Sequence, residues 1–142
     1  MLNQIMKSLA IALEVSPFTP DENGIYKIEI DQFNVEIMQH SSWIRWETEL
    51  SFRFDTELDY QKEQMLKRCL QLSLKTVLDS QETVTINKQL CMVLQGKASL
   101  DQLSEEMFLS LLSQHLTMCE RYSELLEHER VNHAVNHTVW LP

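Results

Sequence analysis

The sequence predicts a single α+β domain in which an antiparallel sheet is flanked by three helices. Apolar residues recur at helical spacing in three segments, and they alternate with polar residues at a period of two in the segments between them. The strands come in groups, three and then two, and do not alternate with helices as in α/β proteins. The length of 142 residues fits one domain. The expected order is therefore α-β-β-β-α-β-β-α, with residues 1–130 as the domain and residues 131–142 as a polar, flexible tail.

The first helix is expected over residues 2–15, where apolar side chains fall on one face. Ser16-Pro17 and Thr19-Pro20 should end it, because a residue that precedes proline avoids the helical region. Asn23-Gly24 then marks a turn. The apolar residues of the helix are Leu2, Ile5, Met6, Leu9, Ala12 and Leu13.

Three half-buried strands follow, over residues 26–31, 33–37 and 43–54. In each of them apolar and polar residues alternate, which is typical of a sheet with one face on the core and one in water. His40-Ser41-Ser42 interrupts the alternation as a hairpin turn does. The three strands should form an antiparallel meander.

A second helix is expected from Thr56, which forms a capping box with Asp59, to about Asp79. One contact with a sheet needs an apolar stripe of roughly 100°, and this helix carries two adjacent stripes, so we expect apolar neighbours on two sides. The stripes are Leu58, Met65, Cys69 and Leu72, and beside them Leu66, Leu70, Leu74, Val77 and Leu78.

Two short strands, over residues 83–87 and 90–94, precede the last helix. The second is apolar at every position, which predicts cover on both faces, and Gly96-Lys97 should close it. Ser99 and Gln102 form another capping box, so the last helix should start there and run to about Glu127. Its core stripe is Leu103, Met107, Leu111, Met118, Tyr122 and Leu125, flanked by Phe108, Leu112 and Cys119.

Glycine content and charge exclude several classes of function. Glycine occurs only at positions 24 and 96, so the sequence contains neither the glycine-rich phosphate-binding loops of nucleotide enzymes nor the nucleophile elbow of hydrolases, which need closely spaced glycines. The formal charge of −9 disfavours nucleic acid and anionic membranes, which are bound through Lys and Arg. A protein or a small molecule remains as the partner.

The sequence predicts a cytoplasmic location. Residues 1–15 make a poor signal peptide, and no apolar run approaches the 18 or more residues of a membrane span. The cysteines, Cys69, Cys91 and Cys119, are odd in number and widely spaced, as expected of reduced and mostly buried thiols.

Candidate chemical sites are weak, and we expect no catalytic residue, no cofactor and no metal. If the tail were helical, Glu129, His133 and His137 would share a face with the spacing of zinc ligands, but a repeated Val-Asn-His in a polar terminus produces the same pattern. Cys69 and Cys119 lie on apolar helix stripes and Cys91 lies in an apolar strand, so all three are expected to be inert packing residues. His115 is expected to be a hydrogen-bonded helix residue and not a catalytic base. Glu47 and Glu49 share a strand face and are typical of solvated acids.

Surplus apolar surface is the more informative feature. Several large apolar residues lie at turns or on faces that the core does not need, and Met and aromatic residues are enriched at protein interfaces. A surface rich in methionine, of which the chain has seven, adapts to different partners. The surplus residues are Phe18, Phe33, Met38, Trp43, Trp140 and Leu141.

These features together resemble the class I type III secretion chaperones over about residues 2–127. The resemblance lies in the acidic chain, the order of elements, the first helix with the turn at residues 21–24, and Leu103 followed by the apolar run 108–126. The segment Glu120-Arg121-Tyr122-Ser123-Glu124-Leu125-Leu126 is similar to the family's closing helix. The strand from Trp43 is longer than in the family, and the tail after Glu129 has no counterpart.

The resemblance implies a non-enzymatic homodimer that needs no cofactor. It would bind the N-terminal segment of one or more secreted effectors, keep that segment partly unfolded and deliver it to the secretion apparatus, with the secretion ATPase as a further candidate partner. The residues implied for effector binding are Ile5, Leu9, Phe18, Phe33, Met38, Trp43 and Trp46. Those implied for the dimer contact are Leu66, Leu70, Leu74, Met92 and Leu94.

A second function stays open from the residues alone. A small-molecule-binding or isomerase-type α+β cone domain has a similar composition, and His40 or Glu47 would then line its pocket. Core packing is also an alternative role for Ile5, Leu9 and Trp46.

Overall fold

The computed structural model describes the backbone of residues 2–54, 60–76 and 82–139, and the side chains of these residues up to Glu127. The elements follow the predicted order α-β-β-β-α-β-β-α. Their bounds are α1 Leu2–Ala12, β1 Tyr26–Ile30, β2 Phe33–His40, β3 Trp43–Arg53, α2 Tyr60–Thr76, β4 Thr83–Ile86, β5 Cys91–Ser99, a 3-10 turn Leu100–Gln102, and α3 Glu105–Val139.

The five strands form one antiparallel sheet in the order β1-β2-β3-β5-β4. The predicted meander of the first three strands is confirmed, and its hairpins turn on two residues each, between Ile30 and Phe33 and between His40 and Trp43. The first residue of each turn has a positive φ, 57° at Asp31 and 56° at Ser41, as tight hairpins require. In the resulting register, the apolar side chains of all three strands face the same side.

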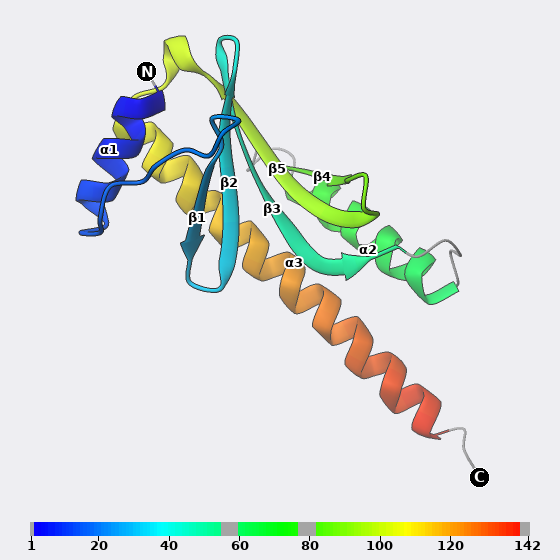
Figure 1. The fold of residues 1–142 in the computed structure, drawn as a ribbon. Coiled ribbons are helices and arrows are strands. Elements are labelled where there is room, and N and C mark those ends of the chain that lie inside the picture. The colour runs from blue at the N-terminus through cyan, green and yellow to red at the C-terminus, as the bar shows by residue number, and fades with distance from the viewer. Residues whose placement is uncertain (1, 55–59, 77–81, 140–142) are drawn as a thin grey trace.

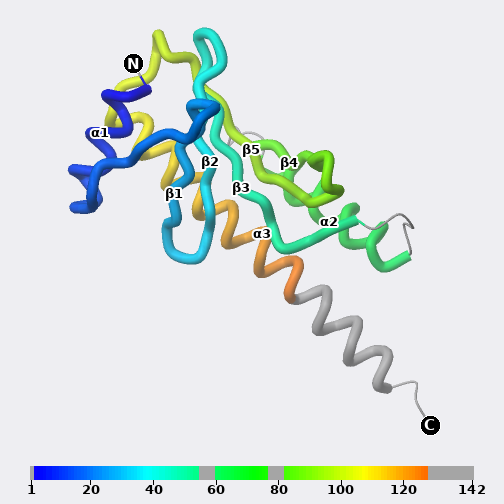
Figure 2. Tube along the Cα trace, viewed as in Figure 1, coloured from blue at the N-terminus to red at the C-terminus, as the bar shows by residue number. Residues whose placement is uncertain are grey.

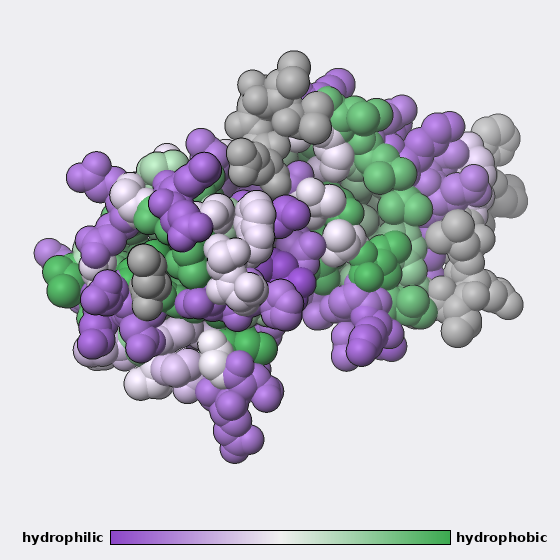
Figure 3. Space-filling model, turned by 90° about the horizontal axis from the view of Figure 1, so that it is seen from above, coloured by the Kyte–Doolittle hydropathy of each residue, from purple (hydrophilic) through white to green (hydrophobic). Residues whose placement is uncertain are grey.

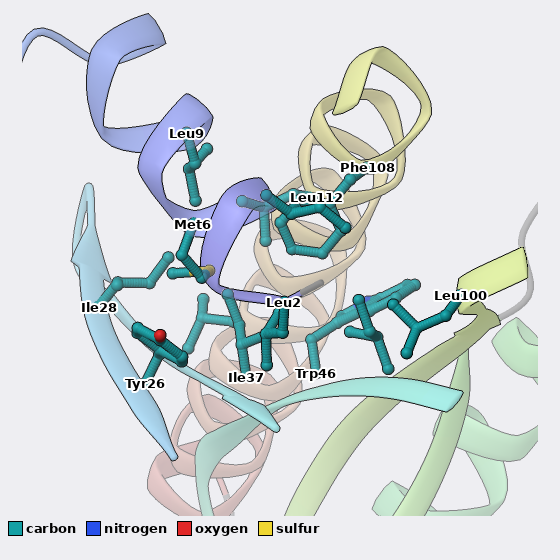
Figure 4. Packing of buried hydrophobic residues seen from close by; sticks show 13 residues of the cluster. Leu2, Met6, Leu9, Tyr26, Ile28, Ile37, Trp46, Leu100, Phe108 and Leu112 are labelled. Atoms are coloured by element: carbon teal, nitrogen blue, oxygen red, sulfur yellow. The ribbon is translucent and has the colours of Figure 1, made fainter. Parts of the chain in front are cut away.

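The helices cover that apolar face. α3 runs along the sheet (Figures 1 and 2). α1 packs near the start of α3, and α2 packs beside the middle of α3, at the end of the sheet that carries β4. The core consequently has two parts, and α3 contributes to both. The first cluster joins α1 and β1–β3 to Phe108 and Leu112 (Figure 4), and the second joins α2, β3 and β5 to Met118, Cys119 and Tyr122.

Three predicted helix ends were wrong, and β2 and β5 each end three or more residues later than predicted. α1 stops at Ala12 and not at Val15, because Glu14 takes a left-handed φ of 55°. The N–H groups of Glu14 and Val15 then bond the carbonyls of Ile11 and Ala10 in a Schellman motif, so this cap ends the helix before the prolines do.

β5 extends to Ser99, past the predicted end at Gly96-Lys97, because the long β3 offers pairing partners up to Trp43 opposite Ser99. Ser99 makes no side-chain cap bond, so α3 does not begin at the predicted capping box. Ser104 is the cap instead, since its Oγ accepts the Met107 N–H at 3.1 Å. α3 also continues beyond Glu127, to Val139.

Some predictions fall outside the described residues. The capping box of Thr56 and Asp59 and the stripe residues Leu58, Val77 and Leu78 lie in the segments 55–59 and 77–81. The predicted cover on both faces of β5 is met only at Met92, Val93 and Leu94, which are all buried; Cys91 is half-buried and Leu90 is 39% exposed.

Candidate partner-binding surfaces

An apolar cleft lies where β3 begins and α3 starts. It has a volume of about 300 Å³ and is lined by Trp43 and Ala98 from the sheet and by Leu103, Met107 and Leu111. Trp43 is 46% exposed and Met107 is 50% exposed. The ammonium of Lys97, also in the lining, lies 5.2 Å from the centroid of the Trp43 ring, a cation–π contact. The cleft fits a large apolar side chain of a partner.

Met107 was expected in the core stripe of the last helix, and that prediction was wrong. Met107 lies in the first turn of α3 and is 50% exposed, on the rim of the cleft, while its neighbour Phe108 points into the first cluster. Its helical spacing from Leu103 and Leu111 was visible in the sequence, but the start of the helix relative to the sheet was not.

The other residues implied for effector binding lie in different environments. Phe18 and Met38 are half-buried; Phe18 packs on the first cluster, and the Met38 sulfur lies 3.1 Å from Nη2 of Arg45. Of the implied set, only Trp43 lines the surface cleft. Those that lie in the interior of the chain are Ile5, Leu9, Phe33 and Trp46.

A second apolar surface covers α2 and the adjoining edge strand β4. Leu70 is 50% exposed, Leu74 is 75% exposed and Ile86 on β4 is 46% exposed. Seen from above, hydrophobic side chains gather over the half of the molecule that carries α2 and the β4–β5 hairpin (Figure 3). We call Leu70, Leu74 and Ile86 the α2–β4 surface.

The residues implied for the dimer contact divide between this surface and the core. Leu70 and Leu74 belong to the α2–β4 surface, and Leu66 is half-buried against the second cluster. Met92 and Leu94 lie inside that cluster, each 0% exposed. The two stripes of α2 are therefore used differently: Met65 and Cys69 pack on the sheet side, while Leu70 and Leu74 of the adjacent stripe face water.

A polar network crosses the boundary between the two clusters. The imidazole of His115 lies 2.8 Å through Nδ1 from Oε2 of Glu82 and 2.7 Å through Nε2 from Oγ1 of Thr48. Glu82 also accepts the Trp46 indole N–H at 3.0 Å. Carboxylate, imidazole and hydroxyl are in the order of a catalytic triad, but Thr48 is only 1% exposed and His115 is 0% exposed. The arrangement therefore holds the interior together and gives a substrate no access to the hydroxyl.

Cys119 lies beside this network, with Sγ 3.6 Å from Nε2 of His115. Burial raises the pKa of the Cys119 thiol from its ordinary 9.0 to about 12, with a smaller opposing effect from Thr48. Burial also raises the pKa of Tyr122, whose hydroxyl bonds Ser73 on α2 at 2.6 Å. Both groups thus fold in their neutral forms.

Alkaline pH is expected to destabilise the chain through Cys119. Above about pH 9 the thiol of the unfolded chain ionises while the buried thiol stays protonated up to about 12, so the unfolded state releases the proton first. The free energy of unfolding should fall by about 1.4 kcal/mol per pH unit in this window. Urea unfolding of the wild type and of Cys119→Ala at several pH values measures it. Parallel pH dependences of the two proteins would contradict this assignment.

The predicted acid pair of the outer sheet face is engaged by neutral amides. Gln95 Nε2 donates to Glu47 and Asn87 Nδ2 donates to Glu49, each at 3.1 Å. Within the described side chains, no group of three His, Cys, Asp or Glu residues could hold a metal ion. Glu129, His133 and His137 lie outside those side chains. No helix in the described part of the chain is long and apolar enough to span a membrane.

A five-stranded sheet with helices on one face, a filled core and apolar surfaces on the outside defines a small α+β protein-binding module. The chain belongs to the Tir chaperone protein (CesT) family, which matches residues 4–123. The resemblance to type III secretion chaperones that the sequence indicated is thereby confirmed.

Solved structures with the same fold are distant in sequence. A chain of the ExsC–ExsE complex is 16% identical, with a TM-score of 0.69, and the match covers 88% of this chain and 92% of that chain. A chain of the HopA1–SchA chaperone–effector complex is 14% identical, with a TM-score of 0.68 and coverage of 87% and 93%. The Yersinia pestis type III secretion chaperone SycH, in complex with a stable fragment of YscM2, is 13% identical, with a TM-score of 0.62. That match covers 87% of this chain and 100% of that chain. The comparison with curated protein sequences gives no match.

Proposed function

We propose that this chain is a cytoplasmic, non-enzymatic chaperone of type III secretion. It binds the N-terminal segment of one or more secreted effectors, keeps that segment partly unfolded and delivers it to the secretion apparatus, with the secretion ATPase as a further partner. The observation that carries this proposal is the exposed apolar cleft around Trp43 in a member of the Tir chaperone family.

The effector segment binds in extended form. Trp43, Met38 and Phe18 contact it directly, since these three are at least partly exposed. The buried members of the implied set, Ile5, Leu9, Phe33 and Trp46, form the interior on which this surface rests. An edge strand of the sheet adds main-chain hydrogen bonds, which place little demand on the sequence of the effector.

Two copies of the chain pair through the α2–β4 surface. Leu70, Leu74 and Ile86 are exposed in the single chain, and Leu66 continues the surface inward. Met92 and Leu94 lie on β5 opposite Ile86 and Val84 of β4, and their burial in the second cluster supports that side of the sheet. Pairing removes from water a cluster of large apolar side chains, the main driving force of association.

The alternative of a small-molecule or isomerase site has less support. His40 is exposed at the β2–β3 hairpin, and Glu47 lies on the outer sheet face opposite Glu36, so the groups that would line the pocket do not converge.

Co-expression with the proteins encoded beside this gene tests the proposal. We expect one of them to co-purify through its N-terminal segment, and that segment to be cut by protease when the chaperone is removed. Replacing Trp43 with Ala should weaken binding by at least about 30-fold, since a central aromatic anchor contributes 2 kcal/mol or more. Tyr60→Ala, which removes another exposed aromatic side chain far along the chain, is the matched control.

Two results would contradict the proposal. One is a wild-type chain that binds none of these proteins while a small ligand raises its melting temperature. The other is an effector segment that is equally folded with and without the chain. Equal binding by wild type and Trp43→Ala would show that the cleft is not part of the effector-binding surface. The co-purification experiment with the wild type would then decide whether the chain is a chaperone.

A further inference from the structure

β4 is a short edge strand whose own side chains specify its register weakly. It has four residues, Thr83–Ile86, and among the described strands it pairs with β5 alone, from Thr83 opposite Gln95 to Ile86 opposite Met92. Its sequence repeats Thr and a β-branched apolar residue, so a slip of two residues returns the same kind of side chain to each face. None of the four residues is fully buried. Another feature must fix which β5 residues they face.

Glu82, the residue before β4, enters the core. Its side chain is 5% exposed, and its two oxygens reach the Trp46 indole N–H at 3.0 Å and Nδ1 of His115 at 2.8 Å. It passes over Gly96 of β5, where an added Cβ would lie 2.8 Å from Oε1. Because Gly96 has no side chain, the carboxylate of Glu82 has room to cross β5 and reach Trp46 and His115.

These bonds are directional. A carboxylate only accepts, so Nδ1–H of His115 donates to Glu82. In the neutral imidazole, Nε2 then accepts the hydroxyl proton of Thr48. A two-residue slip of β4 would carry Glu82 about 7 Å along the sheet. The N–H groups of Trp46 and His115 would then be buried without this acceptor, which folded proteins avoid.

We propose that Glu82 is a positioning residue that fixes the register of β4 on β5. Through this register it sets where Ile86 lies relative to Leu70 and Leu74, and so the shape of the surface through which two copies pair. The second half of this inference rests on the proposed homodimer. A buried charge is weak support for stability, because apolar replacements of similar volume are often neutral; its best attested role is to specify register.

The test compares Glu82→Met, which fills a similar volume, with Glu82→Gln, which keeps an oxygen acceptor for the indole N–H. In the wild type and in Glu82→Gln, NMR should give one set of cross-strand contacts, with Thr85 opposite Val93. In Glu82→Met we expect a second set or loss of these contacts, and a dimer dissociation constant raised at least tenfold in sedimentation equilibrium. Glu82→Ala is measured in parallel, so that a folded variant without the carboxylate is available.

The control is Leu9→Ala, which weakens the first cluster at the opposite end of the sheet. It should lower the melting temperature and leave both the register and the dissociation constant unchanged. An unaltered β4–β5 contact pattern in folded Glu82→Met and Glu82→Ala would overturn the proposal. A monomeric wild type would instead overturn the proposed homodimer, and the NMR register would still decide the role of Glu82.

Discussion

Replacing Gly96 with alanine is expected to lower the free energy of unfolding by about 3 kcal/mol. The added Cβ would lie 2.6 Å from Cε2 of Trp46 and 2.8 Å from Oε1 of Glu82. Trp46 is 1% exposed and meets Phe108 edge to face at 5.9 Å, so its ring has no space into which to move. Relief of the clash requires the loss of the indole–carboxylate hydrogen bond, a shift of β5, or both. Urea unfolding at a fixed chain concentration measures the change.

Gly24 is the other glycine in the chain and provides a matched control. A Cβ there meets nothing within 4 Å, but the residue has a φ of 78°, so Gly24→Ala should cost about 1 kcal/mol from backbone strain alone. Trp46→Phe removes the part of the indole nearest to Gly96 and should make the cost of Gly96→Ala much smaller in that background. An equal cost with either residue at position 46 would show that the clash with Trp46 is not the cause.

Replacing Leu74 with Asp is expected to raise the dissociation constant of the proposed homodimer at least about 100-fold. The side chain is 75% exposed in the single chain and would be covered by the second copy, so the substitution places an unpaired charge in an apolar contact. Because the residue is exposed before pairing, the stability of the monomer should change by less than about 0.5 kcal/mol. Sedimentation equilibrium over a range of concentrations measures the constant.

Ile11→Asp is the matched control, since Ile11 is 77% exposed at the end of α1, on the other cluster's side of the molecule. It should leave the dimer intact. A Leu74→Asp protein that remains dimeric at all concentrations would place the contact elsewhere on the chain.

Much of the fold could be predicted from the sequence because local patterns report local geometry. The alternation from Ile44 to Phe52 gave β3 and its buried face, since successive side chains of a strand must point to opposite sides. The helical spacing of Leu2, Ile5 and Leu9 gave α1 in the same way. The ends of the helices and strands were harder to predict from the sequence. The start of α3 depended on how far β5 could pair with β3, and β5 continues to Ser99 because β3 extends to Trp43.

The candidate surfaces show the same division. Periodicity placed Met65 and Cys69 on one stripe of α2 and Leu70 and Leu74 on the next, but it did not say which stripe meets the sheet. That choice follows from the position of α3, whose Tyr122 bonds Ser73 and turns the first stripe inward. Met107 was wrongly predicted to be in the core for a related reason: an apolar residue on a helix is buried only if another part of the chain packs against it.

The sequence by itself determined the element order, the two-faced sheet and the surplus of apolar surface, because each depends on residues close together in the chain. Only the tertiary structure brought Glu82 to Trp46, 36 residues away, and to His115, 33 residues away. No local period relates these positions. Their contact exists because β5 lies between β3 and β4, and because Gly96 has no side chain where the three meet.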